Sequence, residues 1–269
     1  MIHFWKMNGA GNDFVTLDNR DLRHSLTTAQ IAALCDRHRG VGADGLLAVE
    51  PAENGADFRM RYYNADGGEA EMCGNGARCF ARFANMLNGW NLERVSFETP
   101  AGVIGATFHG DNVRILMSDP HSLRLGLTLD FCGHPQTVHS VNTGVPHAVM
   151  IVPDLAAVPV KEWGAATRYH PEFQPKGTNA NFLQVTPEGI AIRTYERGVE
   201  DETLACGTGM VACALVHHLL TGAPSPVRVK VKGGDTLEIG FEKSGDGFSN
   251  VTLTGPADIV FEGEVKLPS

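Results

Sequence analysis

Two copies of one unusual nine-residue segment constrain this chain more than any other feature of its sequence. Residues 73–81 read Cys-Gly-Asn-Gly-Ala-Arg-Cys-Phe-Ala, and residues 206–214 read Cys-Gly-Thr-Gly-Met-Val-Ala-Cys-Ala. Each copy is a cysteine, then Gly-polar-Gly, then a largely apolar run. The leading residues, Cys73 and Cys206, lie 133 positions apart. We therefore expect two half-sites that face one shared ligand.

Both segments predict a helix that begins at the cysteine. In the first copy, apolar residues recur at i, i+3, i+4 and i+7 from Phe80, and Gly89 stands where a helix C-terminus favours glycine. The second copy continues to Leu220 before Gly222 and is apolar almost all round, which is typical of a buried helix. It is shorter than the roughly 20 residues that a membrane span needs.

A cysteine at a helix N-terminus has special chemistry. The unsatisfied N–H groups and the helix dipole favour negative charge there, so the thiol pKa falls below its usual value of about 8.5. The Gly-x-Gly segment lets backbone N–H groups approach a ligand closely, and such groups suit a carboxylate. Two facing helix starts would supply an acid and a base on opposite sides of one anion.

Other interpretations of the cysteines remain open at this point. A free cysteine is most often a small buried packing residue. We interpret the remaining four cysteines in this way, namely Cys35, Cys79, Cys132 and Cys213. A structural zinc site is disfavoured, because the cysteine pairs 73/79 and 206/213 lack the close spacing of zinc ligands.

Composition and charge exclude several classes of protein. The chain has 269 residues, 43% of them hydrophobic and 20% charged, as in ordinary globular proteins. The net charge is −9 without a run of lysine or arginine, which argues against nucleic acid and anionic membranes as partners. Because no signal peptide or long apolar span is visible, we expect a cytoplasmic protein. Six cysteines without a disulfide pattern also fit a reducing compartment.

The rest of the chain repeats one plan. In each half, short strands and a glycine-rich loop precede the cysteine segment, and further strands follow it. A helix from Ala29 to about Arg37, capped by Thr27 or Thr28, is predicted in the first half, and residues 177–183 match the glycine loop and strand at 42–49. The predicted strands are 2–7, 14–18, 46–49, 57–63, 94–98, 103–108, 112–117, 148–152, 190–195, 227–232, 236–241 and 250–254. Such a repeat predicts two β-rich domains, each wrapped about one long helix, with the site in the cleft between them.

Five motifs together resemble the diaminopimelate epimerase family over nearly the whole chain. Besides the two cysteine segments, they are Gly11-Asn-Asp-Phe14, Asn64-Ala-Asp-Gly67 and Tyr195-Glu-Arg-Gly198. Proline racemases and phenazine-pathway isomerases share only scattered pieces of this set. The combination is therefore much more specific than any single motif.

The resemblance implies an α/β (α+β) fold of two pseudo-symmetric domains, each a curved mixed sheet wrapped around a central helix. It implies domains at 1–117 and 118–255, with a last strand in 256–269 returning to the first. The implied reaction interconverts LL- and meso-diaminopimelate, with neither pyridoxal phosphate nor a metal, in lysine and peptidoglycan precursor synthesis. The partner is thus a small molecule, and we expect a homodimer because most soluble oligomers are symmetric dimers.

The resemblance also assigns roles to single residues. Cys73 and Cys206 would be the two bases. The N–H groups that hold the reacting carboxylate would be those of Gly74, Asn75, Gly207 and Thr208.

The resemblance further implies that Glu196 and His147 contact the reacting amino group and help to set the protonation of the thiols. The planar fork of Arg197 would grip the distal carboxylate. The residues that would orient the distal amino-acid end by neutral hydrogen bonds are Asn12, Asn64 and Asn179. Taken singly, several of these residues have plain structural explanations, such as a turn at Asn64 or a buried structural histidine at His147.

Two positions depart from some family members. Gly45 stands where certain epimerases carry Gln, and Val145 stands where many carry Asn. Both changes affect the distal end of the substrate site and leave the cysteine chemistry intact. The rival functions are an epimerase for another amino acid, a non-catalytic amino-acid-binding protein, and a thiol–disulfide oxidoreductase, the last disfavoured by the lack of Cys-x-x-Cys.

Overall fold

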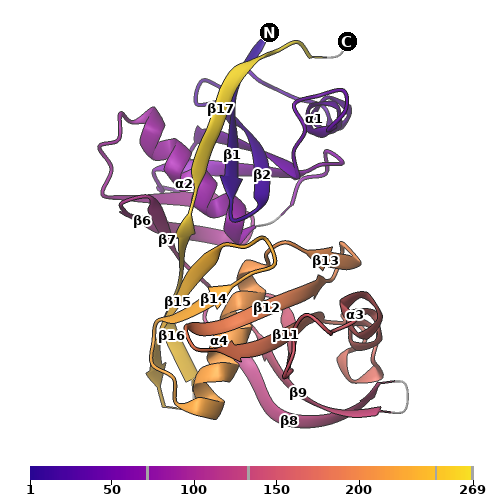
Figure 1. Cartoon of the computed structure of the whole chain (residues 1–269). Coiled ribbons are helices and arrows are strands. Elements are labelled where there is room, and N and C mark those ends of the chain that lie inside the picture. Colours follow the sequence, from indigo (N-terminus) through magenta and orange to yellow (C-terminus); the bar gives the residue numbers. More distant parts are fainter. Residues whose placement is uncertain (71–72, 132–133, 246, 268–269) are drawn as a thin grey trace. The chain divides into compact units, whose positions relative to one another are not determined.

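The computed structural model describes residues 1–70, 73–131, 134–245 and 247–267, so Cys132 lies outside the described residues. The chain forms two compact units (Figure 1). Unit 1 consists of Met1–Ile115 and Gly255–Ser269, and unit 2 consists of Leu116–Thr254. Each unit is a mixed sheet with one long helix against it, and together they form an α+β architecture.

Unit 1 is built on a mixed sheet. Its strands, in spatial order, are β17 (Asp258–Val265), β1 (Ile2–Gly9), β2 (Asn12–Asp18), β3 (Gly45–Pro51), β4 (Phe58–Asn64), β5 (Arg94–Thr99), β6 (Gly102–His109) and β7 (Asn112–Leu116). The pairs β2–β3 and β4–β5 are parallel, and the other neighbours are antiparallel. Helix α1 (Thr28–Cys35) begins with a capping box between Thr27 and Gln30 and contacts β3.

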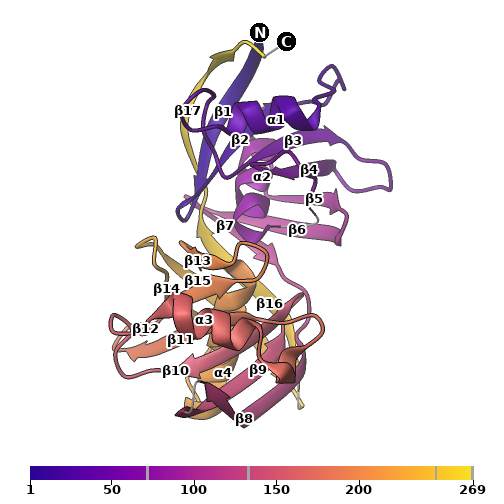
Figure 2. The ribbon, with the colours of Figure 1, turned by 90° about the vertical axis from the view of Figure 1, so that its right-hand side faces the viewer.

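Helix α2 (Gly74–Leu87) lies against the strands of unit 1 (Figures 1 and 2). It begins after Cys73 and ends at Asn88, which confirms the predicted helix, and Gly89 follows with φ 68°. The residues 75–81 and 83–85 are all buried. The helix contacts β1 to β6 and also β17, so nearly every strand of the unit packs on it.

Unit 2 repeats this sheet. Its strands, in spatial order, are β8 (His121–Phe131), β9 (His134–Asn142), β10 (Pro146–Ile151), β11 (Asn179–Thr186), β12 (Gly189–Glu196), β14 (Val227–Lys230), β15 (Thr236–Ser244) and β16 (Gly247–Pro256). The parallel pairs, β10–β11 and β12–β14, stand at the same places in the order as in unit 1. The short strand β13 (Asp201–Thr203) pairs with the end of β12.

Helix α4 (Gly207–Thr221) is the central helix of unit 2. Every residue from Gly209 to His217 is buried, and Gly222 closes the helix in the left-handed conformation at φ 73°. This confirms the buried helix that the sequence predicts after Cys206. Helix α3 (Val160–Arg168) and the 3-10 turn η1 (Pro171–Phe173) complete the unit, with α3 packed on β11 and β12.

The two halves of the chain exchange their last strands. Strand β8 ends the first half but pairs with β9 of unit 2, and β17 ends the second half but pairs with β1 of unit 1. Residue 258, where β17 begins, lies 133 positions beyond residue 125 of β8. The first and last described strands therefore lie side by side, with Ile2 opposite Val265.

Five elements were not predicted from the sequence. They are β8, β9, α3, η1 and β13. In β8 the alternating leucines 123, 125, 127 and 129 signal a strand, but the register shifts twice, so Leu125 is 42% exposed. The predicted turn at residues 8–13 is shorter than expected, because only Ala10 and Gly11 leave the strands, both with positive φ.

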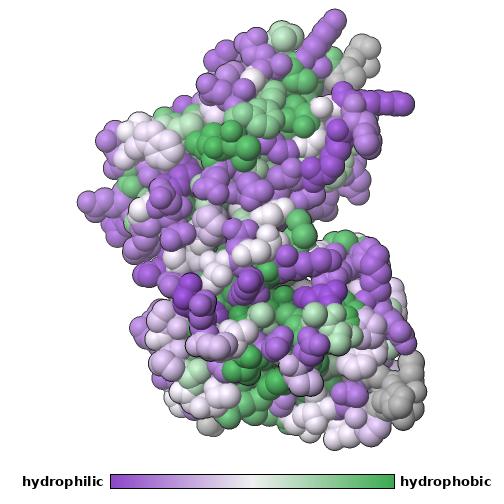
Figure 3. Space-filling model, viewed as in Figure 1, coloured by the Kyte–Doolittle hydropathy of each residue, from purple (hydrophilic) through white to green (hydrophobic). Residues whose placement is uncertain are grey.

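The surface carries scattered apolar side chains. Along β17, Val260 and Phe261 are 58% and 49% exposed, and green residues lie over this strand in Figure 3. Within the described part of the chain, none of the helices has the length and apolar character needed to cross a membrane.

We predict that Gly164→Ala destabilises unit 2. An added Cβ at this position of α3 would overlap Cβ and Cγ of the buried Tyr195 on β12. Alanine gains about 1 kcal/mol over glycine in helix propensity, but overpacking costs typically about 1–3 kcal/mol. We expect the net effect to lower the free energy of unfolding, measured in urea, by up to about 2 kcal/mol.

The matched control is Gly105→Ala on β6, where an added Cβ meets nothing within 4 Å. This variant should be as stable as the parent protein or slightly more stable. Equal stability of the Gly164→Ala protein would show that α3 shifts freely on β12.

Candidate functional site

One edge of the unit 1 sheet gathers the residues that the sequence motifs single out. The strand registers place Phe14 opposite Gly45, and Gly45 opposite Asn64. The start of β2, the start of β3 and the end of β4 therefore share this edge. Cys73, the N-cap of α2, lies there too, because its Sγ is 3.4 Å from Oδ1 of Asn12.

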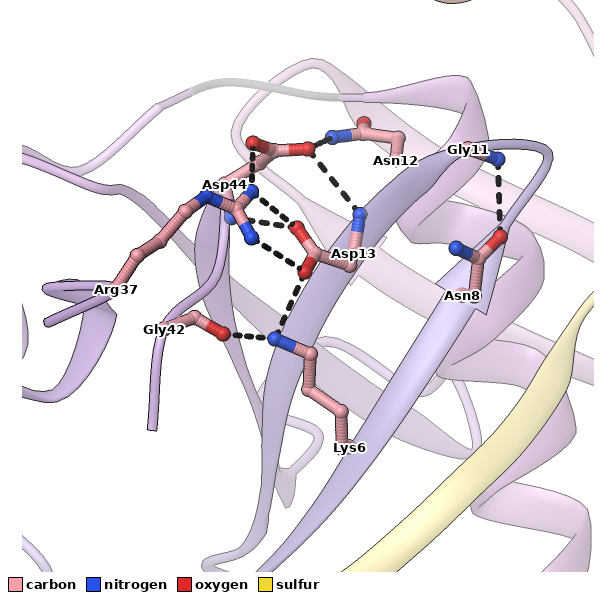
Figure 4. A network of polar contacts seen from close by, with 8 residues as sticks. All are labelled: Lys6, Asn8, Gly11, Asn12, Asp13, Arg37, Gly42 and Asp44. Atoms are coloured by element: carbon pink, nitrogen blue, oxygen red, sulfur yellow. Dashed lines mark hydrogen bonds and ion pairs between the residues drawn. The ribbon is translucent and has the colours of Figure 1, made fainter. Parts of the chain in front are cut away.

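A network of charged side chains holds Asn12 in place (Figure 4). Asn12 donates from Nδ2 to Asp44 Oδ2 at 2.7 Å. Arg37 spans both carboxylates, with bonds of 2.8 and 2.9 Å to Asp13 and 2.7 Å to Asp44. Lys6, whose side chain is only 9% exposed, lies 2.8 Å from Asp13. The network fixes which end of the Asn12 amide faces the cysteine.

The matching edge of unit 2 gathers a second group. His147 on β10 lies opposite Asn179 on β11, and the antiparallel pairing of β11 with β12 brings Glu196 to the same edge. Oδ1 of Asn179 accepts from the Arg197 N–H at 2.7 Å, and Nδ2 donates to the Pro146 carbonyl at 3.1 Å. The Asn179 amide therefore bonds main-chain groups at both ends.

Cys206 stands at the start of α4 as Cys73 stands at the start of α2. The two N-cap residues have similar extended dihedrals, φ −138° and ψ 120° at Cys73 and φ −125° and ψ 110° at Cys206. The sulfur of Cys206 is 3.6 Å from Oγ1 of Thr208, which is 2.8 Å from Nε2 of His147. Cys206 is buried and Cys73 is half-buried.

The N-termini of α2 and α4 can attract an anion. The first helical bonds run from Ala77 N to Cys73 O at 2.7 Å and from Met210 N to Cys206 O at 2.9 Å. The N–H groups before these bonds have no acceptor within the helix. They include those of residues 74 and 75 in α2 and of residues 207 and 208 in α4, and they carry the positive end of the helix dipole. Neither cysteine side chain caps its own helix in the described structure.

The second glycine of each Gly-x-Gly has a packing reason that the sequence alone does not reveal. A Cβ at Gly209 would overlap Oδ1 of Asn181 and would lie 3.3 Å from Cβ of Cys206. A Cβ at Gly76 would lie 3.4 Å from Leu47 and Phe14. These glycines let the helix start pack closely on the strands beneath it, in addition to any approach of a ligand.

Burial separates the other cysteines from the two helix-start cysteines. It raises the thiol pKa of Cys35 to about 11 and of Cys79 to about 12, and it raises that of Cys213 as well. All three are buried free thiols. Raised pKa values and burial make them unreactive, which supports their interpretation as packing residues.

Burial also shifts the pKa of two groups in unit 2. It lowers the pKa of His147 to about 3, and the nearby Arg197 guanidinium adds to this effect, so the imidazole is neutral at pH 7. Burial raises the pKa of the Glu196 carboxyl. Among the described residues, no group of three or more His, Cys, Asp or Glu side chains is arranged to hold a metal ion.

Sequence reasoning did not identify two sets of residues at these edges. The first is the Asp44 network of unit 1, and the second is Asn181 with Thr194 in unit 2, where the Thr194 hydroxyl donates to Asn181 Oδ1 at 2.9 Å. A signal existed for Asn181, because it follows Asn179 at i+2 and thus shares its face of β11. Asp44 ends the glycine-rich loop of residues 39–45, but its partners depend on strand register.

Comparison with known proteins identifies close relatives. A family model described as diaminopimelate epimerase matches residues 4–123 and 139–260. A protein of that name from Chlorobaculum tepidum is 44% identical, over 97% of this chain and 100% of the relative. Another from Aquifex aeolicus is also 44% identical, over 98% of each chain. These similarities extend over essentially the full length of the relatives.

Solved structures with much lower identity share the fold. A probable proline racemase from Agrobacterium radiobacter is 16% identical with a TM-score of 0.71, over 100% of this chain and 94% of that one. A putative phenazine biosynthesis protein from Clostridium difficile is 12% identical with a TM-score of 0.75, over 99% and 100%. At these identities the likeness shows the two-unit fold alone.

We predict that the Asp13 carboxylate stabilises unit 1 in a pH-dependent way. Burial alone would raise its pKa, but hydrogen bonds and charge from Arg37 and Lys6 outweigh burial and lower the pKa far below the usual 3.8. A depressed pKa contributes stability above pH 3.8, which is lost as the pH falls through the folded-state value. Asp13→Asn should lower the free energy of unfolding at pH 7 by about 2 kcal/mol, and about half of that difference should vanish by pH 3.

The measurement is urea unfolding of both proteins at pH 7, 5 and 3. The control is Asp21→Asn, because Asp21 pairs with Arg23 at the surface, where both side chains are exposed. That change should cost less than about 0.5 kcal/mol. A pH-independent difference for Asp13→Asn would contradict the predicted ionisation.

Proposed function

The chain belongs to the diaminopimelate epimerase family, and we propose that it interconverts LL-2,6-diaminopimelate and meso-diaminopimelate through two cysteines. It is an isomerase of the amino-acid epimerase class. Identity of 44% along nearly the entire chain supports the substrate. The proposal includes a role in lysine and peptidoglycan precursor synthesis, in the cytoplasm, where thiols stay reduced.

The observation that carries the mechanism is the pair of equivalent cysteines, each the N-cap of a buried helix. An α-proton is a very weak acid, so its removal needs a positioned base, a positioned acid and stabilisation of the developing charge. The thiolate of one cysteine takes the proton from Cα, and the thiol of the other delivers its proton to the opposite face. One C–H bond breaks and one forms, and the two cysteines exchange protonation states.

The helix N-termini supply the electrostatic stabilisation in this proposal. The N–H groups of Gly74, Asn75, Gly207 and Thr208 bind the carboxylate next to the reacting Cα. Negative charge that develops on this carboxylate in the transition state is favoured by the positive ends of both helix dipoles. The chain itself provides acid, base and anion site, so the proposed mechanism uses neither pyridoxal phosphate nor a metal.

The remaining residues recognise the rest of the substrate. Arg197 binds the distal carboxylate, while Asn12 and Asn64 hydrogen-bond the distal amino-acid end. Asn179 supports Arg197, because its Oδ1 holds the Arg197 N–H. A Glu196 carboxylate would pair with the reacting ammonium group.

His147 has a different role in this proposal from the one that the resemblance implies. Both of its ring nitrogens are engaged, Nε2 with Thr208 and Nδ1 with Asn181. Because the ring is buried and neutral, it acts on the cysteine through Thr208 rather than by direct contact with the amino group.

An epimerase for another amino acid is the second candidate. The hydroxyproline epimerase from Agrobacterium vitis shares the fold with a TM-score of 0.72 at 15% identity. The departures at Gly45 and Val145 also remove two possible polar contacts to a distal substrate group. Assays of several amino acids side by side with diaminopimelate decide between these substrates.

We predict that purified protein epimerises LL-diaminopimelate in heavy water and that the inverted Cα gains solvent deuterium. Cys73→Ser and Cys206→Ser should each abolish epimerisation, since serine has the right size but is a far weaker acid. Each variant should keep slow proton abstraction or elimination on the isomer or halogenated analogue that faces its remaining thiol. The two variants should therefore prefer opposite isomers, as chiral chromatography and mass spectrometry would detect.

The matched control is Cys213→Ala, which removes a buried thiol of α4 and should leave turnover unchanged. Treatment of the parent protein with a chelator and hydroxylamine should also leave turnover unchanged. Wild-type rates in either serine variant, or the same isomer preference in both, would disprove the two-thiol assignment. Inversion without deuterium uptake would exclude proton transfer with solvent-exchangeable groups.

We predict that Arg197→Ala lowers kcat/KM for diaminopimelate by about a hundredfold or more, since a charged hydrogen bond contributes about 1.5–3 kcal/mol and the guanidinium can form two. Arg197→Lys should recover only part of this loss, because lysine keeps the charge but lacks the planar fork. The control is Arg228→Ala, which removes a half-exposed arginine 3.9 Å from Glu188. Near-normal kinetics of Arg197→Ala would show that the distal carboxylate is bound elsewhere.

A further inference from the structure

A chain of hydrogen-bonded polar side chains, most of them buried, lies behind Cys206 in unit 2. It connects β12, β11, β10 and the start of α4 by hydrogen bonds. We call it the Cys206 hydrogen-bond chain, and its members are Thr194, Asn181, His147 and Thr208. Thr194, Asn181 and His147 are each no more than 3% exposed, and Thr208 at the start of α4 is half-buried.

The orientation of the Asn181 amide is fixed at both ends. Nδ2 donates to the carbonyl of Ala148 at 3.0 Å, and a carbonyl can only accept. Oδ1 accepts from the hydroxyl of Thr194 at 2.9 Å. The amide nitrogen therefore points towards β10, with a second hydrogen still to donate.

That second hydrogen determines the tautomer of His147. Nδ2 of Asn181 lies 3.1 Å from Nδ1 of His147, so Nδ1 must be the acceptor. A neutral imidazole with an accepting Nδ1 carries its proton on Nε2. Nε2 therefore donates to Oγ1 of Thr208, which lies 2.8 Å away.

The hydrogen bond from His147 to Thr208 determines which atom donates in the contact between Thr208 and Cys206. Because Thr208 Oγ1 accepts from His147, its single hydroxyl proton is available for the sulfur of Cys206, 3.6 Å away. A hydrogen bond donated to a group favours its charged, deprotonated form. Glu196 at the end of β12 and Arg197 next to it are charged residues at this edge, and the first turn of α4 holds no acidic residue.

The hydrogen bond between Cys73 and Asn12 in unit 1 runs in the opposite direction, from the thiol to the neighbouring side chain. Nδ2 of Asn12 donates to the Asp44 carboxylate, which can only accept, so Oδ1 of Asn12 faces the cysteine. The Cys73 thiol donates to this oxygen at 3.4 Å. A hydrogen bond donated by the thiol favours the protonated form.

Two positions in unit 1 that match members of the Cys206 hydrogen-bond chain are apolar. By strand register, Phe14 of β2 stands where His147 stands in β10, and Leu47 of β3 stands where Asn181 stands in β11. Both are fully buried, and both pack under Gly76, as Asn181 packs under Gly209. Among the described residues, apolar side chains thus fill the places in unit 1 that His147 and Asn181 occupy in unit 2.

We propose that Cys206 is the resting thiolate and Cys73 the resting thiol, and that Asn181 is the positioning residue that sets this order through the His147 tautomer. The proposal rests on the two-cysteine function argued above. In one turnover the Cα–H bond breaks, its proton goes to Sγ of Cys206, and the Cys73 S–H proton goes to the opposite face of Cα. The enzyme is left with a Cys73 thiolate and a Cys206 thiol.

The test titrates each thiol without substrate. The ultraviolet absorbance of thiolate is followed against pH in Cys73→Ser, which keeps Cys206, and in Cys206→Ser, which keeps Cys73. We expect Cys206 to ionise at a pH about one unit lower, a tenfold larger ionisation constant. The other four cysteines are common to both variants and cancel in the comparison. Equal midpoints, or a lower midpoint for Cys73, would overturn the proposal.

Second substitutions in the Cys73→Ser protein test the role of Asn181. Asn181→Leu removes the donor to His147 at similar size, and we expect the Cys206 midpoint to rise by about one unit. Thr208→Val should raise it equally, while Thr208→Ser, which keeps the hydroxyl, should restore it. A merely structural role of these residues would not produce this rescue.

The Asn181 and Thr208 variants test separate parts of the proposal. An unchanged midpoint in Asn181→Leu would disprove its positioning role, and equal midpoints in Thr208→Val and Thr208→Ser would disprove the hydroxyl donor. Circular dichroism checks the fold, and if Asn181→Leu does not fold, the two Thr208 variants decide. Because no substrate is present, failure of the diaminopimelate assay would refute the proposed function and leave the titration result standing.

Discussion

Burial of one apolar helix against each curved sheet is the constraint on which the rest of the structure depends. Helix α4 is buried at every position from Gly209 to His217, so it can lie only under the strands of unit 2. Its N-terminus then emerges at the sheet edge that carries His147 and Glu196. The same packing brings the start of α2 to the edge that carries Asn12 and Asn64. Hydrophobic burial thus decides where both cysteines and both helix dipoles stand.

The exchange of the last strands makes each sheet depend on the whole chain. Strand β17 pairs with β1 through a register that runs from Ile2 to Asn8, so the first strand of the chain is held by the last. Strand β8 pairs with β9 in the same way in unit 2. Neither half of the sequence contains all the strands of one sheet. The two repeated halves of the sequence therefore do not correspond to two separate domains, because each sheet takes one strand from the other half.

Local patterns in the sequence predicted the helices better than the polar contacts. The spacing of apolar residues and the terminal glycines gave α2 and α4 nearly to the residue, because helix ends depend on neighbours in the chain. Strand β8 was missed although its leucines alternate along the sequence, and the two shifts in its register became visible only in the structure. Asn181 and Asp44 were missed because their partners come from other strands and loops, at positions set by register. Such pairings follow from tertiary structure, so the i+2 spacing from Asn179 places Asn181 on the same face of β11 but does not reveal its partners.

A repeated backbone with diverged side chains can solve a problem that exact symmetry cannot. Epimerisation needs a base on one face and an acid on the other, yet two identical half-sites would give both cysteines the same proton affinity. In unit 1 the cysteine donates to Asn12, whose orientation Asp44 fixes. In unit 2 the hydroxyl of Thr208 is directed towards the sulfur by His147. The buried Phe14 and Leu47 of unit 1 stand where His147 and Asn181 stand in unit 2. Because these side chains are apolar, they cannot replace His147 and Asn181 in a hydrogen-bond chain like that of Cys206. The difference in proton affinity between the two thiols therefore arises from the side chains packed beneath each helix start.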